Sequence, residues 1–245
     1  MASLDFYDLN VYSLPEGKNT VEEMAVLASR FGYAGIAITN PFDSFDSTKG
    51  TVFQGIELFS AVEINVDNAS RLHGLVGKYR NLADVIVVRG GNENINRAAV
   101  ENPNVDVLAN FGSMKDNGLN HILARSANDN DVAISFDLAE LIGQRGGRRV
   151  RALSNFRKDL ELARKYDVPF ILTANARSVF DLRAPRELIA LAGLFGMTRE
   201  EALKGISSTP KRIISKNRHS SDHVFDGVKI VDSPVDIVLE GGGGQ

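Results

Sequence analysis

Asparagine recurs at the points where a polar side chain follows a short apolar run of this sequence. The residues at these points are Asn10, Asn40, Asn65, Arg89, Asn110, Asp137, Asn175 and Arg177. A carboxamide donates and accepts hydrogen bonds, but it takes up no proton near neutral pH and does not offset the charge of a divalent metal. The four histidines lie away from these points, so they do not supply the missing ligands. The pattern therefore predicts polar binding rather than metal or acid–base catalysis.

Two charged members of this set leave alternatives open. Arg89 can contact a phosphate group, or it can pair with a carboxylate such as Asp137. Asp137 itself can be a lone catalytic carboxylate, or it can cap the N-terminus of the following helix. A hypothesis from another class makes the protein a metal-dependent phosphoesterase with the altered ligands Asp8, Glu63 and Asp137.

Positive charge is concentrated in one part of the chain. Residues 145–218 carry 17 Lys or Arg against 7 Asp or Glu, although the whole chain has a net charge of -3. A basic face attracts phosphate groups, whereas a basic helical surface can also be merely solvated. The segment 143–151, GQRGGRRVR, is accordingly either a phosphate-binding loop or a solvated hinge. The segment 207–218, SSTPKRIISKNR, is either a phosphate-tracking helix or an ordinary amphipathic one.

The elements that must position these side chains are seven apolar runs of strand length, which alternate with helix-length segments. Several runs are almost continuously apolar, as expected for parallel strands that are covered on both faces. Because the carboxyl ends of such strands meet at one end of a barrel, the polar residues should gather there. The runs are Phe6–Val11, Gly35–Thr39, Ile56–Ile64, Val85–Val88, Val105–Ala109, Val132–Phe136 and Phe170–Thr173, with Val228–Val231 as a late candidate for an eighth.

Helix signals stand between the strands. Thr20 with Glu23 and Thr198 with Glu201 have capping-box spacing, and Pro185 suits the first turn of a helix. We therefore expect an α/β fold: an irregular TIM-like (βα) barrel with about seven parallel strands over residues 1–218. Residues 219–245 form a polar extension that ends in a flexible glycine tail.

Composition narrows the class of protein further. The chain has 245 residues, no cysteine, and no apolar stretch long enough to cross a membrane. The missing cysteines exclude disulfides, thiolate zinc sites and a cysteine nucleophile, and they suit a reducing compartment. We expect a soluble, cytoplasmic protein without a membrane partner.

Several segments taken in order resemble the archaeal protein component 3 family of ribonuclease P, the counterpart of the thirty-kilodalton subunit of the eukaryotic enzyme. The resemblance covers about residues 5–218. Its most specific parts are VIVVRGG followed by VDVLAN, and the block ILTANARSVFDLRAPRE; FYDLNVYSLPEG, GYAGIAITN, GIELFSAVEIN, VAISFDLAELI and STPKRII add to it.

The resemblance implies an irregular barrel related to the polymerase and histidinol phosphatase superfamily of metal-dependent phosphoesterases. Those enzymes begin with Asp-Leu-His-x-His, where this chain has Asp8-Leu9-Asn10-Val11-Tyr12. Late in the barrel they use Asp-Ala-His, where this chain has Ala174-Asn175-Ala176. Both departures remove metal ligands, which suggests a former metal site reused as a scaffold.

The resemblance also implies the function. Ribonuclease P removes the 5′ leader of precursor tRNA, and its catalytic RNA performs the hydrolysis with magnesium. This chain would then be inactive alone, with no catalytic residue, metal or cofactor of its own. Its expected partners are the ribonuclease P RNA, protein component 2 and, in the holoenzyme, precursor tRNA; the rival from a third class is a module that binds only protein. The expected RNA contacts are Asn10, Asn40, Arg89, Lys115, Arg148, Arg149, Arg151, Lys158, Asn175, Arg177 and Arg183.

Overall fold

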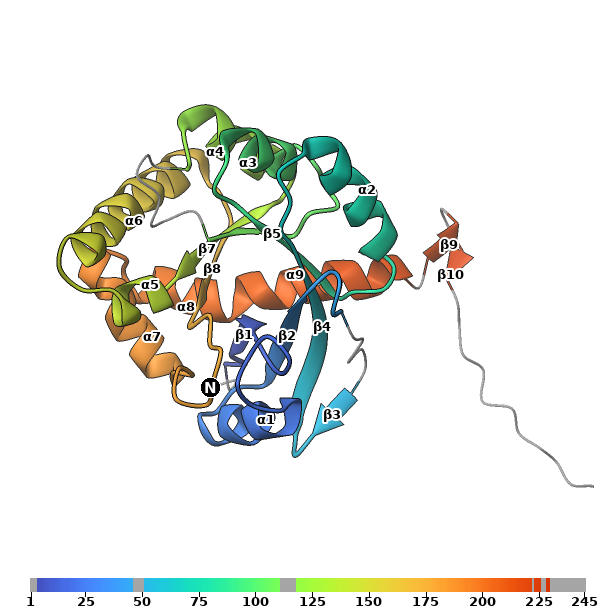
Figure 1. Cartoon of the computed structure of the whole chain (residues 1–245), viewed down its shortest axis with the longest axis horizontal. Helices are drawn as coiled ribbons and strands as arrows, with labels where there is room; N and C mark the ends of the chain where they lie inside the picture. The colour runs from blue at the N-terminus through green and yellow to red at the C-terminus, as the bar shows by residue number, and fades with distance from the viewer. Residues whose placement is uncertain (1–3, 46–50, 111–117, 222, 226–227, 230–245) are drawn as a thin grey trace, which may run out of the picture.

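Seven parallel strands form a curved sheet that is wrapped by helices (Figure 1). The computed structural model describes residues 4–45, 51–110, 118–221, 223–225 and 228–229. The seven predicted strands are confirmed, with ends that differ by two residues at most. They pair in the order β1 (Tyr7–Val11), β2 (Gly35–Pro41), β4 (Ile56–Ile64), β5 (Val85–Arg89), β6 (Val107–Ala109), β7 (Ala133–Asp137) and β8 (Phe170–Thr173).

One more strand extends the sheet outside the parallel series. The strand β3 (Thr51–Phe53) lies antiparallel to β4. The prediction of Val228–Val231 as an eighth barrel strand was wrong. Its described part, β10 (Val228–Lys229), pairs only with β9 (His223–Phe225) in a separate two-stranded sheet.

In the described part of the chain, β1 and β8 do not pair as neighbouring strands. Side-chain and loop hydrogen bonds join these first and last barrel strands instead. The Asp8 carboxylate accepts hydrogen bonds from Thr173 Oγ1 at 2.5 Å and from the backbone N–H of Ala174 at 3.1 Å. The backbone N–H of Tyr12 donates to the carbonyl of Ala176 at 2.8 Å. This substitute for strand pairing makes the barrel irregular, as predicted.

The helices cover the outer face of the sheet, and their ends follow the predicted signals. Capping boxes are present at Thr20 with Glu23 and at Thr198 with Glu201, and Pro185 begins its helix. The helical elements are α1 (Val21–Arg30), α2 (Ala69–Tyr79), α3 (Glu93–Val100), α4 (His121–Asp129), α5 (Ala139–Gly143), α6 (Gly146–Tyr166), α7 (Pro185–Ala192), the 3-10 turn η1 (Gly193–Phe195), α8 (Arg199–Ile206) and α9 (Ser208–Ser221).

The inside of the barrel is apolar and is closed at one end by α9. Alternate residues of each strand point inward, such as Phe59 and Ala61 of β4, and they form one buried cluster with Ile213 and Ile214. Figure 1 shows α9 running across the strands. Because its polar partners lie at the strand beginnings, α9 covers the amino ends of the strands and leaves the carboxyl ends open.

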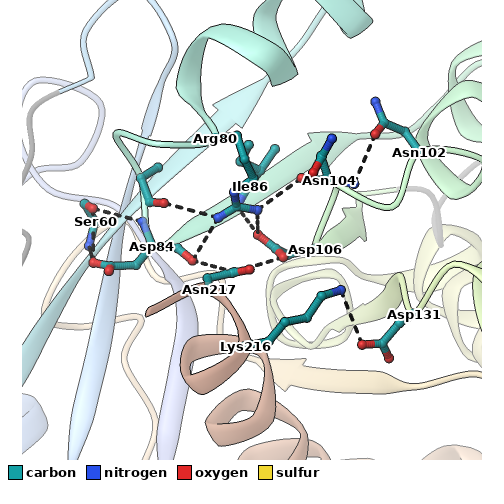
Figure 2. A network of polar contacts seen from close by, with 11 residues as sticks. Ser60, Arg80, Asp84, Ile86, Asn102, Asn104, Asp106, Asp131, Lys216 and Asn217 are labelled. Atoms are coloured by element: carbon teal, nitrogen blue, oxygen red, sulfur yellow. Dashed lines mark hydrogen bonds and ion pairs between the residues drawn. The ribbon is translucent and has the colours of Figure 1, made fainter. Parts of the chain in front are cut away.

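Polar contacts fasten α9 to this end, as Figure 2 shows for its last turns. Asn217 Nδ2 donates to the carbonyl of Asp84 at 2.7 Å and to Asp106 Oδ1 at 3.0 Å. The other carboxylate oxygen of Asp106 lies 2.7 Å from Arg80 Nη1. The cations of α9 also pair with carboxylates at this end of the barrel: Lys211 with Asp5, Arg212 and Lys216 with Asp131, and Arg218 with Glu57 and Asp84. We therefore leave the 207–218 segment out of the candidate phosphate surface.

Candidate functional site

The open end of the barrel is lined with polar side chains that converge on one carboxylate. Glu63 follows Phe59 and Ala61 on the inner face of β4. Its Oε1 accepts hydrogen bonds from Tyr12 Oη at 2.9 Å and Asn110 Nδ2 at 3.3 Å, and it lies 3.4 Å from Arg89 Nη1. The carboxylate partner of Arg89 is thus Glu63 rather than Asp137. The Arg89 side chain remains 38% exposed, so it also faces the open end.

Asp137 joins the ends of two neighbouring strands. Ser135 Oγ donates to its Oδ1 and the backbone N–H of Asn110 donates to its Oδ2, both at 2.7 Å. Burial raises the pKa of Asp137 to about 6, and these two hydrogen bonds oppose the shift. The expected helix-capping role is wrong, because Leu138 occupies the N-cap of α5 and makes no side-chain capping bond.

Asp8 and Tyr12 are also held by hydrogen bonds within the protein. Burial raises the pKa of Asp8 to about 6, against the lowering effect of hydrogen bonds from Thr173, Ala174 and Asn10. Burial, together with the nearby Glu63, raises the pKa of the Tyr12 hydroxyl well above its ordinary value. Tyr12 therefore acts as a hydrogen-bond donor to Glu63 and does not supply a phenolate ligand.

These residues do not fit a divalent metal. The carboxylates of the phosphoesterase hypothesis, Asp8, Glu63 and Asp137, each accept hydrogen bonds from different protein donors. The Arg89 guanidinium sits beside Glu63, where a metal would need the negative charge. Within the described residues, no three His, Cys, Asp or Glu side chains come together as a metal site. The geometry thus disfavours a metal phosphoesterase.

The asparagines of the candidate site do not share one role. Asn10 is 1% exposed, and neither its Oδ1 nor its Nδ2 has a protein partner. It lies in the irregular part of β1, where the register with β2 shifts between Asp8 and Val11. Asn40 pairs in register with Val62 rather than Glu63, and Val62 belongs to the outer core. Asn40 therefore lies apart from the inner ring, contrary to the sequence prediction.

Asn175 and Asn110 adopt the left-handed backbone conformation that asparagine tolerates better than most residues. Their φ angles are 49° and 58°. Asn175 Nδ2 donates to Asn110 Oδ1 at 3.1 Å, whereas the buried Oδ1 of Asn175 accepts no hydrogen bond from the protein. The turn geometry explains why asparagine stands here, and the unused oxygen remains available to a ligand or to water.

Arg177 and Arg183 lie on the loop that follows β8. The Arg177 guanidinium stacks over the ring of Tyr12 at 3.9 Å from the ring centroid. Both arginines line a cavity of about 230 Å³, together with Asn175, Asp181 and the end of α5. Arg183 also lines a groove of about 580 Å³ between α6 and α7, which Arg149 borders as well. The groove therefore connects the barrel end to the arginines of α6.

The arginines of 143–151 lie mostly on a helix, because α6 begins at Gly146 and the predicted loop is short. Arg149 is also exposed, but its guanidinium is partly used within the protein, since its Nε donates to the carbonyl of Gln144 at 2.8 Å and its Nη2 to that of Ile142 at 3.3 Å. Arg148, Arg151 and Lys158 are exposed. Lys158 lies seven residues beyond Arg151, about 10 Å farther along the helix. Lys115 falls outside the described residues.

The structure thus places Asn10, Arg89, Asn175, Arg177 and Arg183 at the barrel end, and Arg149 shares a groove with Arg183, whereas Arg148 and Arg151 are exposed on α6. Sequence reasoning missed the partnership of Tyr12 with Glu63. It also missed Phe180, which is 86% exposed on the loop between Arg177 and Arg183. The signal for Phe180 was a lone aromatic residue between two arginines.

Comparisons with known proteins agree along the whole described barrel. The model of the family described as RNase P subunit p30 matches residues 5–222. The ribonuclease P protein component 3 of Methanococcoides burtonii is 53% identical over 232 residues, which cover 95% of this chain and 96% of that protein.

Solved structures give the same result. A chain of the cryo-EM structure of archaeal ribonuclease P with mature tRNA matches with a TM-score of 0.77 and 28% identity, over 93% of this chain and 99% of that chain. A histidinol phosphate phosphatase from Lactococcus lactis matches with a TM-score of 0.51 and 11% identity, over 78% and 95% of the two chains. This second match shows a shared fold only.

Proposed function

This chain belongs to the RNase P subunit p30 family, and we infer from this membership that it is a protein subunit of ribonuclease P, the endoribonuclease that removes the 5′ leader of precursor tRNA. The observation that carries this function is the match to a chain of the archaeal enzyme, which extends over nearly the full length of both chains. The partners that follow from this are the ribonuclease P RNA and, in the holoenzyme, precursor tRNA.

We propose that the chain binds and shapes the catalytic RNA and performs none of the chemistry. The geometry of the barrel end supports this proposal. Asp8 and Asp137 accept hydrogen bonds from residues of neighbouring strand ends, and the cation Arg89 is paired with Glu63. In this proposal the chain binds no cofactor, and the RNA subunit requires the magnesium ions.

The RNA-binding surface in this proposal runs from the barrel end along the groove to α6. Arg177 and Arg183 supply charge at one end, and Arg148 and Arg151 supply it at the other. Guanidinium groups suit this role because they bind phosphate oxygens with two parallel hydrogen bonds. Lys158 extends the surface along α6.

Protein component 2 is the proposed protein partner, and cytoplasm is the proposed compartment. Among the apolar residues of 119–123, Leu119 and Leu123 are buried in the core, whereas Ile122 is 53% exposed. We therefore propose the partnership without assigning its surface. No helix among the described residues is long and apolar enough to span a bilayer.

Reconstitution tests the proposed function. Ribonuclease P assembled from its RNA and protein subunits should cleave precursor tRNA more efficiently with this chain than without it. The matched control is the same assembly with the chain but without the catalytic RNA, which should show no cleavage. Equal cleavage with and without this chain, at subunit concentrations that saturate the RNA, would contradict the proposal.

A further inference from the structure

The loop between β8 and α7 holds an aromatic ring out in solvent. Phe180 is 86% exposed, more than any other large apolar side chain in the described part of the chain. The loop is fixed on both sides of it, because the backbone N–H of Val179 donates to Asn19 Oδ1 at 3.0 Å and Arg183 Nη1 donates to the carbonyl of Phe180 at 2.7 Å. The ring is therefore presented by a fixed backbone.

Three more contacts hold this loop. Ser178 Oγ donates to Asp181 Oδ2 at 2.7 Å, and Tyr33 Oη donates to the carbonyl of Arg183 at 2.7 Å. The backbone N–H of Lys18 donates to the carbonyl of Arg177, also at 2.7 Å. A loop held in this way loses little conformational entropy when a ligand binds to it.

The hydrogen-bonding capacity of the flanking arginines is largely unused. No described residue accepts a hydrogen bond from the Arg177 guanidinium, although its position is fixed by stacking over Tyr12. In Arg183, only Nη1 donates hydrogen bonds to described residues, to the carbonyls of Phe180 and Leu182. Both groups line the same cavity of about 230 Å³. A planar cation with free N–H groups beside a cavity of this size fits a phosphate group.

A neutral polar group adjoins the two cations. Asn175 lines the cavity, and its Oδ1 is buried with no donor from the protein. Because a buried acceptor without a partner is unfavourable, a ligand group that donates a hydrogen bond to this oxygen is favoured. The ribose hydroxyl and the exocyclic amine of a base are both such donors.

We propose that the loop of residues 175–183 binds one unstacked RNA nucleotide, with its base stacked on Phe180 and its phosphate held by Arg177 and Arg183. This inference rests on the proposed function, since it specifies how the chain contacts RNA. The base must be unpaired, because a base inside a duplex offers no free face to an exposed ring. A nucleotide is the occupant that uses both features of this loop, because an apolar protein contact on Phe180 would leave the unused N–H groups of Arg177 and Arg183 without a partner.

The test measures binding of a labelled single-stranded oligoadenylate of about eight nucleotides to the full chain. Phe180→Ala should weaken the affinity by about 5- to 100-fold, which corresponds to the loss of one stacked base. Phe180→Trp should bind as well as the wild type, and Phe180→Leu should be as weak as Phe180→Ala, because leucine keeps apolar area but has no ring. Leu82→Ala, a substitution of another exposed apolar residue, is the matched control and should change nothing.

Salt dependence separates the base from the phosphate. Phe180→Ala should leave the slope of log affinity against log salt unchanged, whereas Arg177→Ala should lower it by about 0.7. A duplex of the same length should bind all Phe180 variants equally.

Several outcomes would overturn the nucleotide site. These are wild-type affinity in Phe180→Ala, wild-type affinity in Phe180→Leu, or no binding of the single strand by the wild-type chain. A fourth is loss of binding to protein component 2 in Phe180→Ala with oligoadenylate affinity intact, which would assign the ring to a protein interface. None of these results decides the proposed function, because that depends on precursor-tRNA cleavage by the reconstituted enzyme.

Discussion

The arginines at the start of α6 differ in what they can give to RNA, and this difference can be measured. Arg149 already donates two hydrogen bonds to the carbonyls of Gln144 and Ile142, whereas Arg148 and Arg151 are exposed. The combined substitution of Arg148, Arg149 and Arg151 by alanine should therefore remove two phosphate contacts rather than three. Each contact contributes about 0.7 to the salt slope for single strands and about 0.9 for duplex. The expected loss of slope is about 1.4–1.8.

The assay is a salt series of binding affinities between the full chain and the catalytic RNA. The double variant Arg148→Ala/Arg151→Ala should show the same slope as the triple variant, and Arg149→Ala alone should keep the wild-type slope. Arg164→Ala is the matched control on the same helix, because Arg164 pairs with Glu201. A loss of about 2.1–2.7 in the triple variant would mean that Arg149 also contacts phosphate. Unchanged affinity and slope would remove this segment from the interface.

Four further outcomes follow from the structure. Because the pKa of Asp137 is raised in the folded protein, its protonated form stabilises the fold; this stabilisation is complete below about pH 4 and is lost as pH rises through about 6. Asp137→Asn should flatten this part of the pH profile of unfolding free energy by up to about 3 kcal/mol. An unchanged profile would refute the shift. Ile213→Ala and Ile214→Ala should each lower the free energy of urea unfolding by about 2–5 kcal/mol, whereas Lys211→Ala, which breaks an exposed ion pair, should change it far less. The isolated chain saturated with magnesium, manganese or zinc should hydrolyse neither model phosphoesters nor precursor tRNA, and turnover that disappears in Asp8→Asn would contradict the scaffold role. The chain and protein component 2 should co-elute on size exclusion at high salt if apolar contact dominates, and separate elution of the folded proteins at low salt would refute the partnership.

The strands were predictable because burial on both faces leaves a signal that does not depend on neighbours. The run Val85–Val88 is apolar at every position, and only its last residue, Arg89, was left out of the expected strand. The place of α9 was not predictable in this way. Two isoleucines, Ile213 and Ile214, among cations are typical of any amphipathic helix. The helix packs where it does because the amino end of the barrel has an apolar interior that needs a cover.

The candidate site was predictable in its location but not in its pairings. Parallel strands bring their carboxyl ends together whatever their sequence, so the ring of polar side chains could be expected at this end. The partners of Glu63 depend on how neighbouring strands are staggered, and this information is absent from the sequence of any one strand. Asn40 shows the same limit, because its register with Val62 turns it to the outer side.

We propose that contacts suited to a polyanion have taken the place of metal chemistry at the barrel end. The resemblance to the metal-dependent phosphoesterases puts Asn10 and Tyr12 at the positions of two histidine ligands and Ala176 at that of a third, and the charge of Glu63 is balanced by Arg89. Asp8 and Asp137 are buried and accept hydrogen bonds from the protein, and Glu63 is already paired with Arg89. In the proposed function, Arg177 and Arg183 attract phosphate at this end because the carboxylates there are occupied by protein donors. We therefore propose that one set of residue changes accounts for both the missing metal ligands and the binding of RNA.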